Sequence, residues 1–306
     1  MKMINDLKVV SKRENIKVIS LITDFLVCKT KYNFTFEEYF KMQLYKLNDK
    51  KRNEVLNNNI NIKLINKLNP FEHRYLMASI YEFNHKFESF IKRDWLLLDE
   101  QNNEEFRLFI KSRDFIFVPS LDNRKPEIID IKRNNEWQLH QDLINSYRYI
   151  IEEVVTNHKK IKAINASSLN TIKFITILNN NDVYILGSYL NVYINDKKYY
   201  ILIDLATGKT YNKALLDGLV VDHIENYIVK SFKIPLWEKT LAMVNKLPFV
   251  IDKLKYISWE IAITDKEPIL IKASEEPDYM ILNHPIYLEN NNGLFYEINL
   301  ILGGNL

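Results

Sequence analysis

The stretch YISWEIAITDKEPILIKAS, residues 256–274, decides the fold class, because it contains two strand-like runs joined by a short turn. Residues 256–264 and 269–274 are rich in apolar and β-branched residues, and DKEP at 265–268 is a turn signal. An antiparallel hairpin of these runs would place Glu260 opposite or nearly opposite Lys272. We therefore predict a cross-strand ion pair between these side chains. The alternative is that both are solvent-exposed strand residues.

The rest of the chain contains further strand-like runs and several helical patterns. Strands are predicted at 115–118, 127–131, 171–178, 182–194 and 199–207, where Ile, Val, Tyr and Thr are frequent. Helical spacing extends over 34–98, including a single helix over 71–91, and a capping box of Thr35 and Glu38 begins it. Further helices are predicted at 136–149, at 236–247 and after Gly293.

This order of elements predicts an α+β fold with boundaries near residues 100 and 150. We expect a mostly helical region at 1–100, a small α/β lobe at 101–150 and a larger lobe with an antiparallel sheet at 151–306.

Composition excludes several classes of site. The first glycine is Gly187, so the N-terminal half can hold neither glycine-rich nucleotide fingerprint. Cys28 is the single cysteine, which excludes an intramolecular disulfide and a cysteine-based zinc site, and its apolar neighbours predict a buried structural thiol. The six histidines have no metal-binding spacing. The net charge is +3 with both signs interleaved, which argues against a nucleic-acid partner.

Nothing in the sequence predicts a membrane segment. The N-terminal MKMINDLKVVSKREN is polar and lacks the apolar core of a signal peptide. No window approaches the roughly 18 uncharged apolar residues that a membrane-spanning helix needs. We expect a cytoplasmic protein.

Seven phrases, taken in order, resemble the sugar-transfer-associated branch of the ATP-grasp superfamily. They are NHKFESFIKRDWL (84–96), FIFVP (115–119), YIIEEVV followed by NH (149–158), SLNTIKFITI (168–177), ILIDLATGK (201–209), KIPLWEKTL (233–241) and residues 256–274. The resemblance covers the chain from about residue 34 to its end, and the last phrase is the strongest. It implies an ATP-grasp-like fold of two α+β lobes, ATP-dependent ligation of a carboxylate with an amine, and a link to surface-polysaccharide assembly.

The chemical positions of the family are mostly changed in this chain. Val118 stands where the family has a phosphate-binding Lys, and an earlier family Lys falls at or near Ile80. Residues 120–126 lack the glycines of the family's flap. Glu260 keeps one acid of the magnesium-binding strands, but Lys272 replaces the second and Ser274 replaces an Asn. An ammonium group at this place would repel a divalent cation.

Other polar positions of the family are retained. Asn170 and Thr171 begin the family's N-T-x-R motif, with Lys173 in place of Arg, and Asp204 keeps an acid-to-glycine phrase. Glu152 and Glu153 stand where the resemblance places the nucleotide hinge. Each alone suits a surface or strand residue, but together they predict a cleft lined with mixed charge. The candidate ligand-binding residues are Glu152, Glu153, Asn170, Lys173, Asp204, Glu260, Lys272 and Ser274.

Three functions remain open at this point. The correlated losses favour a pseudoenzyme that keeps the fold, has lost Mg-ATP turnover, needs no cofactor and acts by binding. The second is an active divergent ligase, using ATP and Mg²⁺ with Arg124, Lys125, Asp204 and Glu260, in which Glu260 would be a metal ligand. The third is an unrelated α+β interaction protein. The expected partner is a sugar nucleotide, a polysaccharide unit or an amino acid, or a protein of the same pathway.

Overall fold

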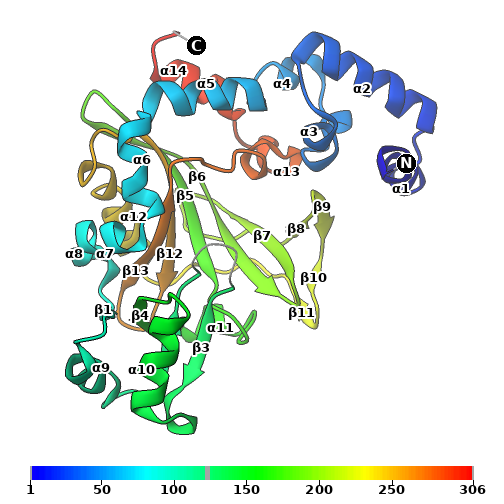
Figure 1. Ribbon diagram of the computed structural model, residues 1–306. Helices are drawn as coiled ribbons and strands as arrows, with labels where there is room; N and C mark the ends of the chain where they lie inside the picture. Colours follow the sequence, from blue (N-terminus) through cyan, green and yellow to red (C-terminus); the bar gives the residue numbers. More distant parts are fainter. Residues whose placement is uncertain (1, 121–124, 305–306) are drawn as a thin grey trace.

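A seven-stranded antiparallel sheet forms the centre of the computed structural model, which describes residues 2–120 and 125–304 (Figure 1). In spatial order its strands are β13 (Pro268–Ser274), β12 (Tyr256–Ile263), β5 (Thr171–Asn179), β6 (Asp182–Ile194), β7 (Lys197–Ile203), β8 (Ala214–Leu216) and β9 (Leu219–Val221). Apolar residues line both faces of the inner strands, so helices pack on each side.

Three two-residue turns fix the register of this sheet. Such turns need left-handed backbone at both central residues, which Asn, Asp and Gly adopt most readily. The central pairs and their φ angles are Asn180 (51°) and Asn181 (65°), Asn195 (49°) and Asp196 (59°), and Asp217 (49°) and Gly218 (77°).

One face of the large sheet is covered by helices from the middle of the chain. They are α6 (Phe71–Ala78), α7 (Ile80–Lys86), α8 (Glu88–Ile91), α12 (Trp237–Val244) and the 3-10 turn η3 (Leu247–Phe249). The single helix predicted over 71–91 is therefore wrong. Ser79 has extended backbone and its hydroxyl accepts a hydrogen bond from the Glu82 amide, so it ends one helix and caps the next.

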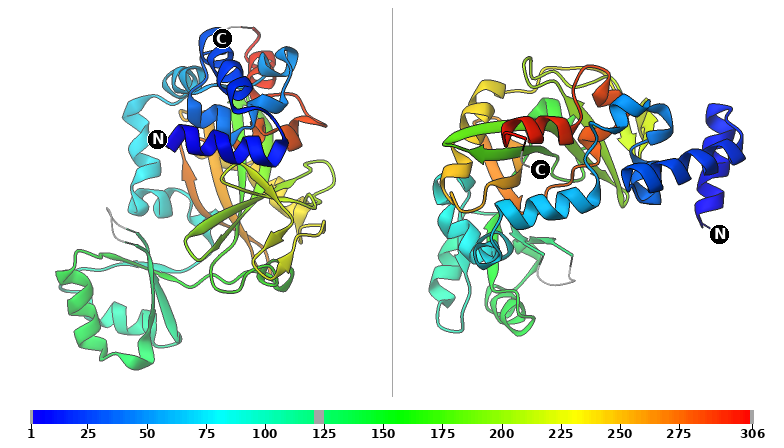
Figure 2. Two further views of the ribbon diagram at one scale, coloured as in Figure 1. Left: turned by 90° about the vertical axis from the view of Figure 1, so that its right-hand side faces the viewer. Right: turned by 90° about the horizontal axis from the view of Figure 1, so that it is seen from above.

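The apolar cluster on the opposite face extends into helices from both ends of the chain, and the first two helices pack on other helices beside the sheet (Figure 2). The helices of this cluster are α1 (Lys2–Glu14), α2 (Val18–Tyr32), α3 (Phe36–Lys41), η1 (Leu44–Lys46), α4 (Asp49–Arg52), α5 (Asn58–Leu68), η4 (Ile281–Asn283), α13 (Pro285–Leu288) and α14 (Leu294–Ile301). The predicted capping box of Thr35 and Glu38 is confirmed. Cys28 is buried, as predicted, and burial raises the pKa of its thiol to about 11.

A second, four-stranded sheet lies at the other end of the molecule from α1 to α4 (Figure 2). Its order is β1 (Trp95–Leu97), β4 (Ile150–Glu153), β2 (Phe115–Val118) and β3 (Glu127–Asp130), packed with α9 (Asn103–Ile110), η2 (Ile131–Arg133) and α10 (Glu136–Asn145). It has an apolar core of its own, built from residues 98–151. Short elements complete the fold: α11 (Lys159–Lys162), β10 (His223–Ile224) and β11 (Tyr227–Ile228).

The predicted α+β class is confirmed, with a small and a large lobe and helices at the N-terminal end. The helix expected over 136–149 ends earlier, at Asn145, because β4 begins at Ile150. The domain boundaries near residues 100 and 150 stay predictions. Within residues 2–120 and 125–304, no helix is both long enough and apolar enough to span a bilayer.

Candidate functional site

A buried carboxylate flanked by two lysines lies on the large sheet. Glu260 on β12 is the direct cross-strand partner of Lys272 on β13 and of Lys173 on β5. Its Oε1 is 3.8 Å from Lys272 Nζ and 3.2 Å from Lys173 Nζ. The predicted Glu260–Lys272 ion pair is therefore confirmed, but the closer cation is Lys173.

The second oxygen of Glu260 also has a polar partner. Glu260 is 6% exposed, and its Oε2 accepts a hydrogen bond of 3.3 Å from Thr171 Oγ1. Burial by itself raises the pKa of this carboxyl, but the charges of Lys173, Lys272 and Lys198, with the hydrogen bond from Lys173, outweigh it. The pKa of Glu260 therefore lies below its usual value, and the group is ionised near neutral pH.

These side chains share the sheet face that carries the N-terminal helices. Glu260 alternates with Trp259 and Ile261, which belong to the core on the opposite face. The same alternation places Lys173, Thr171, Asn191, Tyr193, Lys198, Tyr200 and Lys272 on the Glu260 face. Lys198 Nζ lies 5.2 Å from the ring centre of Tyr193 and 4.9 Å from that of Tyr200. A polar cluster of these residues therefore interrupts an otherwise apolar face.

Three buried polar atoms on this face have no hydrogen-bond partner in the described chain. They are Tyr189 Oη, Asn191 Oδ1 and Ser258 Oγ, in side chains no more than 1% exposed. Register places Tyr189 beside Lys173, Asn191 beside Thr171, and Ser258 two residues before Glu260. Buried polar atoms in native proteins are nearly always satisfied by protein, water or ligand.

The residues around Glu260 do not fit a magnesium ion. Mg²⁺ needs oxygen ligands in octahedral geometry, usually with one or two carboxylates. An ammonium group about 4 Å from a divalent cation costs roughly 8 kcal/mol at an effective dielectric constant of about 20. Here one carboxylate faces two ammonium groups. Across the described ranges, no group of three His, Cys, Asp or Glu side chains could hold a metal ion.

Glu152 belongs to a different buried network. Its Oε2 accepts from Arg93 Nε at 2.9 Å, and its Oε1 accepts from Asn84 Nδ2 at 2.8 Å. Arg93 also donates to the backbone carbonyl of Leu270 on β13 at 2.7 Å. The carboxylate of Glu152 is therefore used to join the small sheet to the large one, and it does not contact the lysines around Glu260.

The other expected residues lie in turns or at strand edges. Asp204 Oδ1 accepts from the amide and hydroxyl of Thr207, at 2.7 and 2.6 Å, in an exposed turn. Asn170 is buried and joined to Asn157 through two hydrogen bonds of 2.8 Å. Glu153 is exposed on β4, and Ser274 accepts a bond from the Glu276 amide. Of the eight expected residues, the structure brings Lys173, Glu260 and Lys272 into contact.

The positions at which the resemblance implied phosphate-binding groups hold apolar residues or lie outside the described residues. Val118 is 1% exposed and packs in the core of the small lobe, and Ile80 begins α7. Residues 121–124 of the expected flap, including Arg124, lie outside the described residues. Lys125 is exposed, and its Nζ lies 3.5 Å from Asp196 Oδ1 in the β6–β7 turn.

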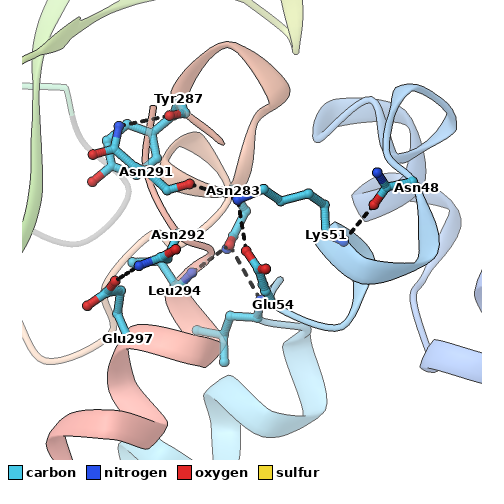
Figure 3. Close-up of polar contacts among 10 residues, drawn as sticks. Asn48, Lys51, Glu54, Asn283, Tyr287, Asn291, Asn292, Leu294 and Glu297 are labelled. Atoms are coloured by element: carbon cyan, nitrogen blue, oxygen red, sulfur yellow. Dashed lines mark hydrogen bonds and ion pairs between the residues drawn. The ribbon is translucent and has the colours of Figure 1, made fainter. Parts of the chain in front are cut away.

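A cavity of about 950 Å³ lies away from these residues, between the β5–β6 hairpin and the C-terminal helices. Figure 3 shows polar contacts beside it. Lys51 Nζ donates to the Asn291 carbonyl at 3.1 Å, and Asn283 Oδ1 accepts from the Leu294 amide at 3.1 Å. The first contact joins α4 to the C-terminal segment, and the second lies within that segment, so both have a structural role.

Sequence reasoning missed several members of the polar cluster. Lys198, Tyr193, Tyr200, Asn191 and Tyr189 come from β6 and β7, which the sequence identified only as strands. The two-residue repeat of these strands could have identified them, because each of these positions is next to an apolar residue of the opposite face. Arg93 stood within a quoted phrase, but its partner Glu152 is 59 residues away.

Comparisons with known proteins give one family match and several matches to solved structures. A family model described as sugar-transfer associated ATP-grasp matches residues 134–301, more than half of the chain. No curated protein sequence matches the chain. Among solved structures, N5-carboxyaminoimidazole ribonucleotide synthetase from Thermus thermophilus is 9% identical with a TM-score of 0.49, covering 89% of this chain and 65% of that one.

Two further structures match to a similar extent. N5-carboxyaminoimidazole synthetase from Staphylococcus aureus, complexed with ADP, is 13% identical with a TM-score of 0.48, covering 76% of this chain and 53% of that one. The ATP-grasp ligase PsnB with its minimal precursor is 8% identical with a TM-score of 0.46, covering 78% and 63%. This chain spans less than two thirds of the length of each, and these matches concern the fold alone. Because the family model covers more than half of the chain, including all seven strands of the large sheet, the chain belongs to the sugar-transfer associated ATP-grasp family.

Proposed function

We propose that this protein is a pseudoenzyme of its family, which binds a ligand on the ATP-grasp fold and does not turn over Mg-ATP. The single observation that carries the proposal is the position of Glu260, whose Oε1 faces Lys173 and Lys272. A metal ion that bridges nucleotide phosphates must neutralise charge developing during phosphoryl transfer. Two ammonium groups occupy the space where such an ion would have to approach this carboxylate.

Further support comes from Val118, because a buried branched side chain cannot bind phosphate as the family's Lys would. The family description also supports a ligand from sugar-transfer chemistry. We therefore propose a sugar nucleotide, a polysaccharide unit or an amino acid as the ligand, or a protein of the same pathway as the partner. A cytoplasmic location belongs to the same proposal.

The test is formation of a productive Mg-ATP complex. We expect no ADP release above that of a Glu260→Ala variant purified identically, which reports contaminating ATPase. We also expect that adding Mg²⁺ to ATP does not raise the melting temperature beyond that seen with ATP and EDTA, since a ligand stabilises only through its affinity for the native state. The thermal-shift comparison requires no acceptor substrate.

The competing reading is an active ligase. ADP release that depends on Mg²⁺ and disappears in Glu260→Ala would establish it and end the pseudoenzyme proposal. A melting temperature raised by Mg-ATP but unchanged by ATP in EDTA would count against our proposal in the same way.

A further inference from the structure

We propose that the polar cluster around Glu260 binds the phosphate group of a small molecule without a divalent cation, through the ammonium groups of Lys272 and Lys198. This inference rests on the proposed function, because it names the ligand class of the same site. Phosphate bound by lysine alone requires ammonium groups that still have N–H donors free for the ligand.

Lys272 meets this requirement. Its side chain is 64% exposed, and its Nζ is 3.8 Å from Glu260 Oε1, which is beyond hydrogen-bond distance. Lys173 is closer to the same oxygen, at 3.2 Å, and is the buried partner of the carboxylate. Lys272 can therefore donate to a ligand while Glu260 keeps its other ion pair.

Lys198 is a second cation with unused capacity. It is half-buried over the rings of Tyr193 and Tyr200, and it forms no ion pair with any carboxylate in the described ranges. Burial, with the nearby charge of Lys272, holds the pKa of its ammonium below the usual value, although the charges of Glu260 and Asp278 oppose this. A phosphate beside Lys198 would supply the missing counter-charge.

The buried atoms without partners give an independent indication of a polar ligand. Tyr189 Oη, Asn191 Oδ1 and Ser258 Oγ lie on the same face as the lysines. Hydroxyl groups of Tyr and Ser donate to phosphate oxygens directly or through water, and an amide oxygen accepts from a sugar hydroxyl. Their chemistry suits a molecule that carries both phosphate and hydroxyl groups.

The charge count favours an anion over a cation at this place. Lys173 and Lys272 form ion pairs with the single carboxylate of Glu260, and Lys198 lies on the same sheet face, so positive groups outnumber negative ones within this cluster. A divalent cation would raise the local charge, whereas a phosphate would lower it. Inorganic phosphate, a nucleotide and a sugar phosphate share this chemistry.

Calorimetric titration in EDTA tests the proposal with inorganic phosphate, pyrophosphate, ADP and a hexose 1-phosphate as probes. We expect at least one probe to bind, with affinity that falls as salt rises. Lys272→Ala should weaken it about tenfold or more, the order expected for a charge-assisted contact. Lys197→Ala is the control, because Lys197 is an exposed lysine that directly precedes Lys198 and lies on the other sheet face. The affinity of this variant for the same probe should change less than twofold. The probe that binds most tightly shows whether the site takes free phosphate, a nucleotide or a sugar phosphate.

Glu260→Gln distinguishes this site from a metal site, because the two predict opposite changes in phosphate affinity. Removing the carboxylate frees the lysines, so phosphate affinity in EDTA should rise severalfold, whereas loss of a metal ligand would lower it. If this variant does not fold, Lys272→Ala decides alone. No binding of any probe in EDTA, an absolute need for Mg²⁺, or equal loss in Lys197→Ala and Lys272→Ala would overturn the inference. Absence of probe binding together with absence of ADP release would overturn this inference and leave the proposed function standing, whereas Mg²⁺-dependent ADP release would end the proposed function.

Discussion

At the residue scale, the environment of Glu260 makes its carboxylate difficult to replace. It is buried, ionised and flanked by Lys173 and Lys272, and both of its oxygens have partners. A buried ion pair adds little to folding stability when compared with apolar residues of the same size. Loss of one member is costly, however, because the other charge stays buried without compensation. Lys173, whose side chain is 11% exposed, would be left in that state.

Glu260→Gln should therefore lower the free energy of unfolding at pH 7 by about 3 kcal/mol, because the Lys173 ammonium loses its counter-charge. The folded pKa of Glu260 lies below its usual value of 4.5, so its contribution is fully present above that pH. It is lost as pH falls through the lower folded pKa. Urea unfolding from pH 7 to pH 3 measures both effects, and the gap between wild type and variant should narrow only below about pH 4.5.

The control is Glu276→Gln, at an exposed residue that forms no ion pair in the part of the chain described here. It should change stability by less than about 0.5 kcal/mol. Equal stabilities of wild type and Glu260→Gln at pH 7 would contradict the role given to the Lys173 pair.

At the scale of elements, the β8–β9 turn shows how a local turn signal also serves packing. Asp217 and Gly218 form the two-residue turn, and the Gly218 carbonyl accepts from Gln43 Nε2 at 2.5 Å. A Cβ on Gly218 would lie 2.4 Å from the backbone oxygen of Lys41, at the end of α3. The glycine is therefore needed both for its φ of +77° and for the close approach of α3.

Gly218→Ala should destabilise the protein by more than the about 1–2 kcal/mol that left-handed backbone costs an alanine, because the methyl group also displaces α3. Gly304→Ala is a matched control, since its φ is +79° and no atom lies within 4 Å of the added Cβ. Thermal unfolding of both variants measures the difference. Equal losses would show that backbone strain alone matters at Gly218.

At the scale of the whole molecule, one buried network joins the two sheets. Arg93 and Glu152 have side chains 4% and 5% exposed, and their contacts reach Asn84 on α7 and Leu270 on β13. Because Glu152 belongs to β4, the network fixes the small sheet against the large one. The glutamate expected at a nucleotide hinge is thus a connection between lobes.

Glu152→Gln should cost about 3–5 kcal/mol, since it leaves the Arg93 guanidinium buried without a counter-charge. Relative to wild type, amide hydrogen exchange should accelerate more in β1 and β4 than in β5 and β6, because the small sheet loses its connection to the large sheet. Glu153→Gln, at the exposed neighbouring residue, should leave both measurements nearly unchanged. Uniform exchange across both sheets would contradict the connecting role.

The sequence by itself predicted five of the seven strands of the central sheet, the capping box at Thr35 and the hairpin that places Glu260 opposite Lys272. It missed β8 and β9, and the strand predicted over 199–207 ends earlier, at Ile203. These features depend on neighbouring residues, through turn chemistry and the two-residue repeat of a strand. The single helix predicted over 71–91 failed because the extended backbone at Ser79 was not recognised as a boundary.

Only the tertiary structure decided which polar groups meet. Lys173 approaches Glu260 across 87 residues, Arg93 reaches Glu152 across 59, and the tyrosines and lysine of β6 and β7 join the same face. Such contacts arise when strands distant in sequence pair in register, and strand pairing depends on how the whole sheet packs. Local pattern therefore predicts the elements, whereas the charge balance of the site exists only after they have assembled.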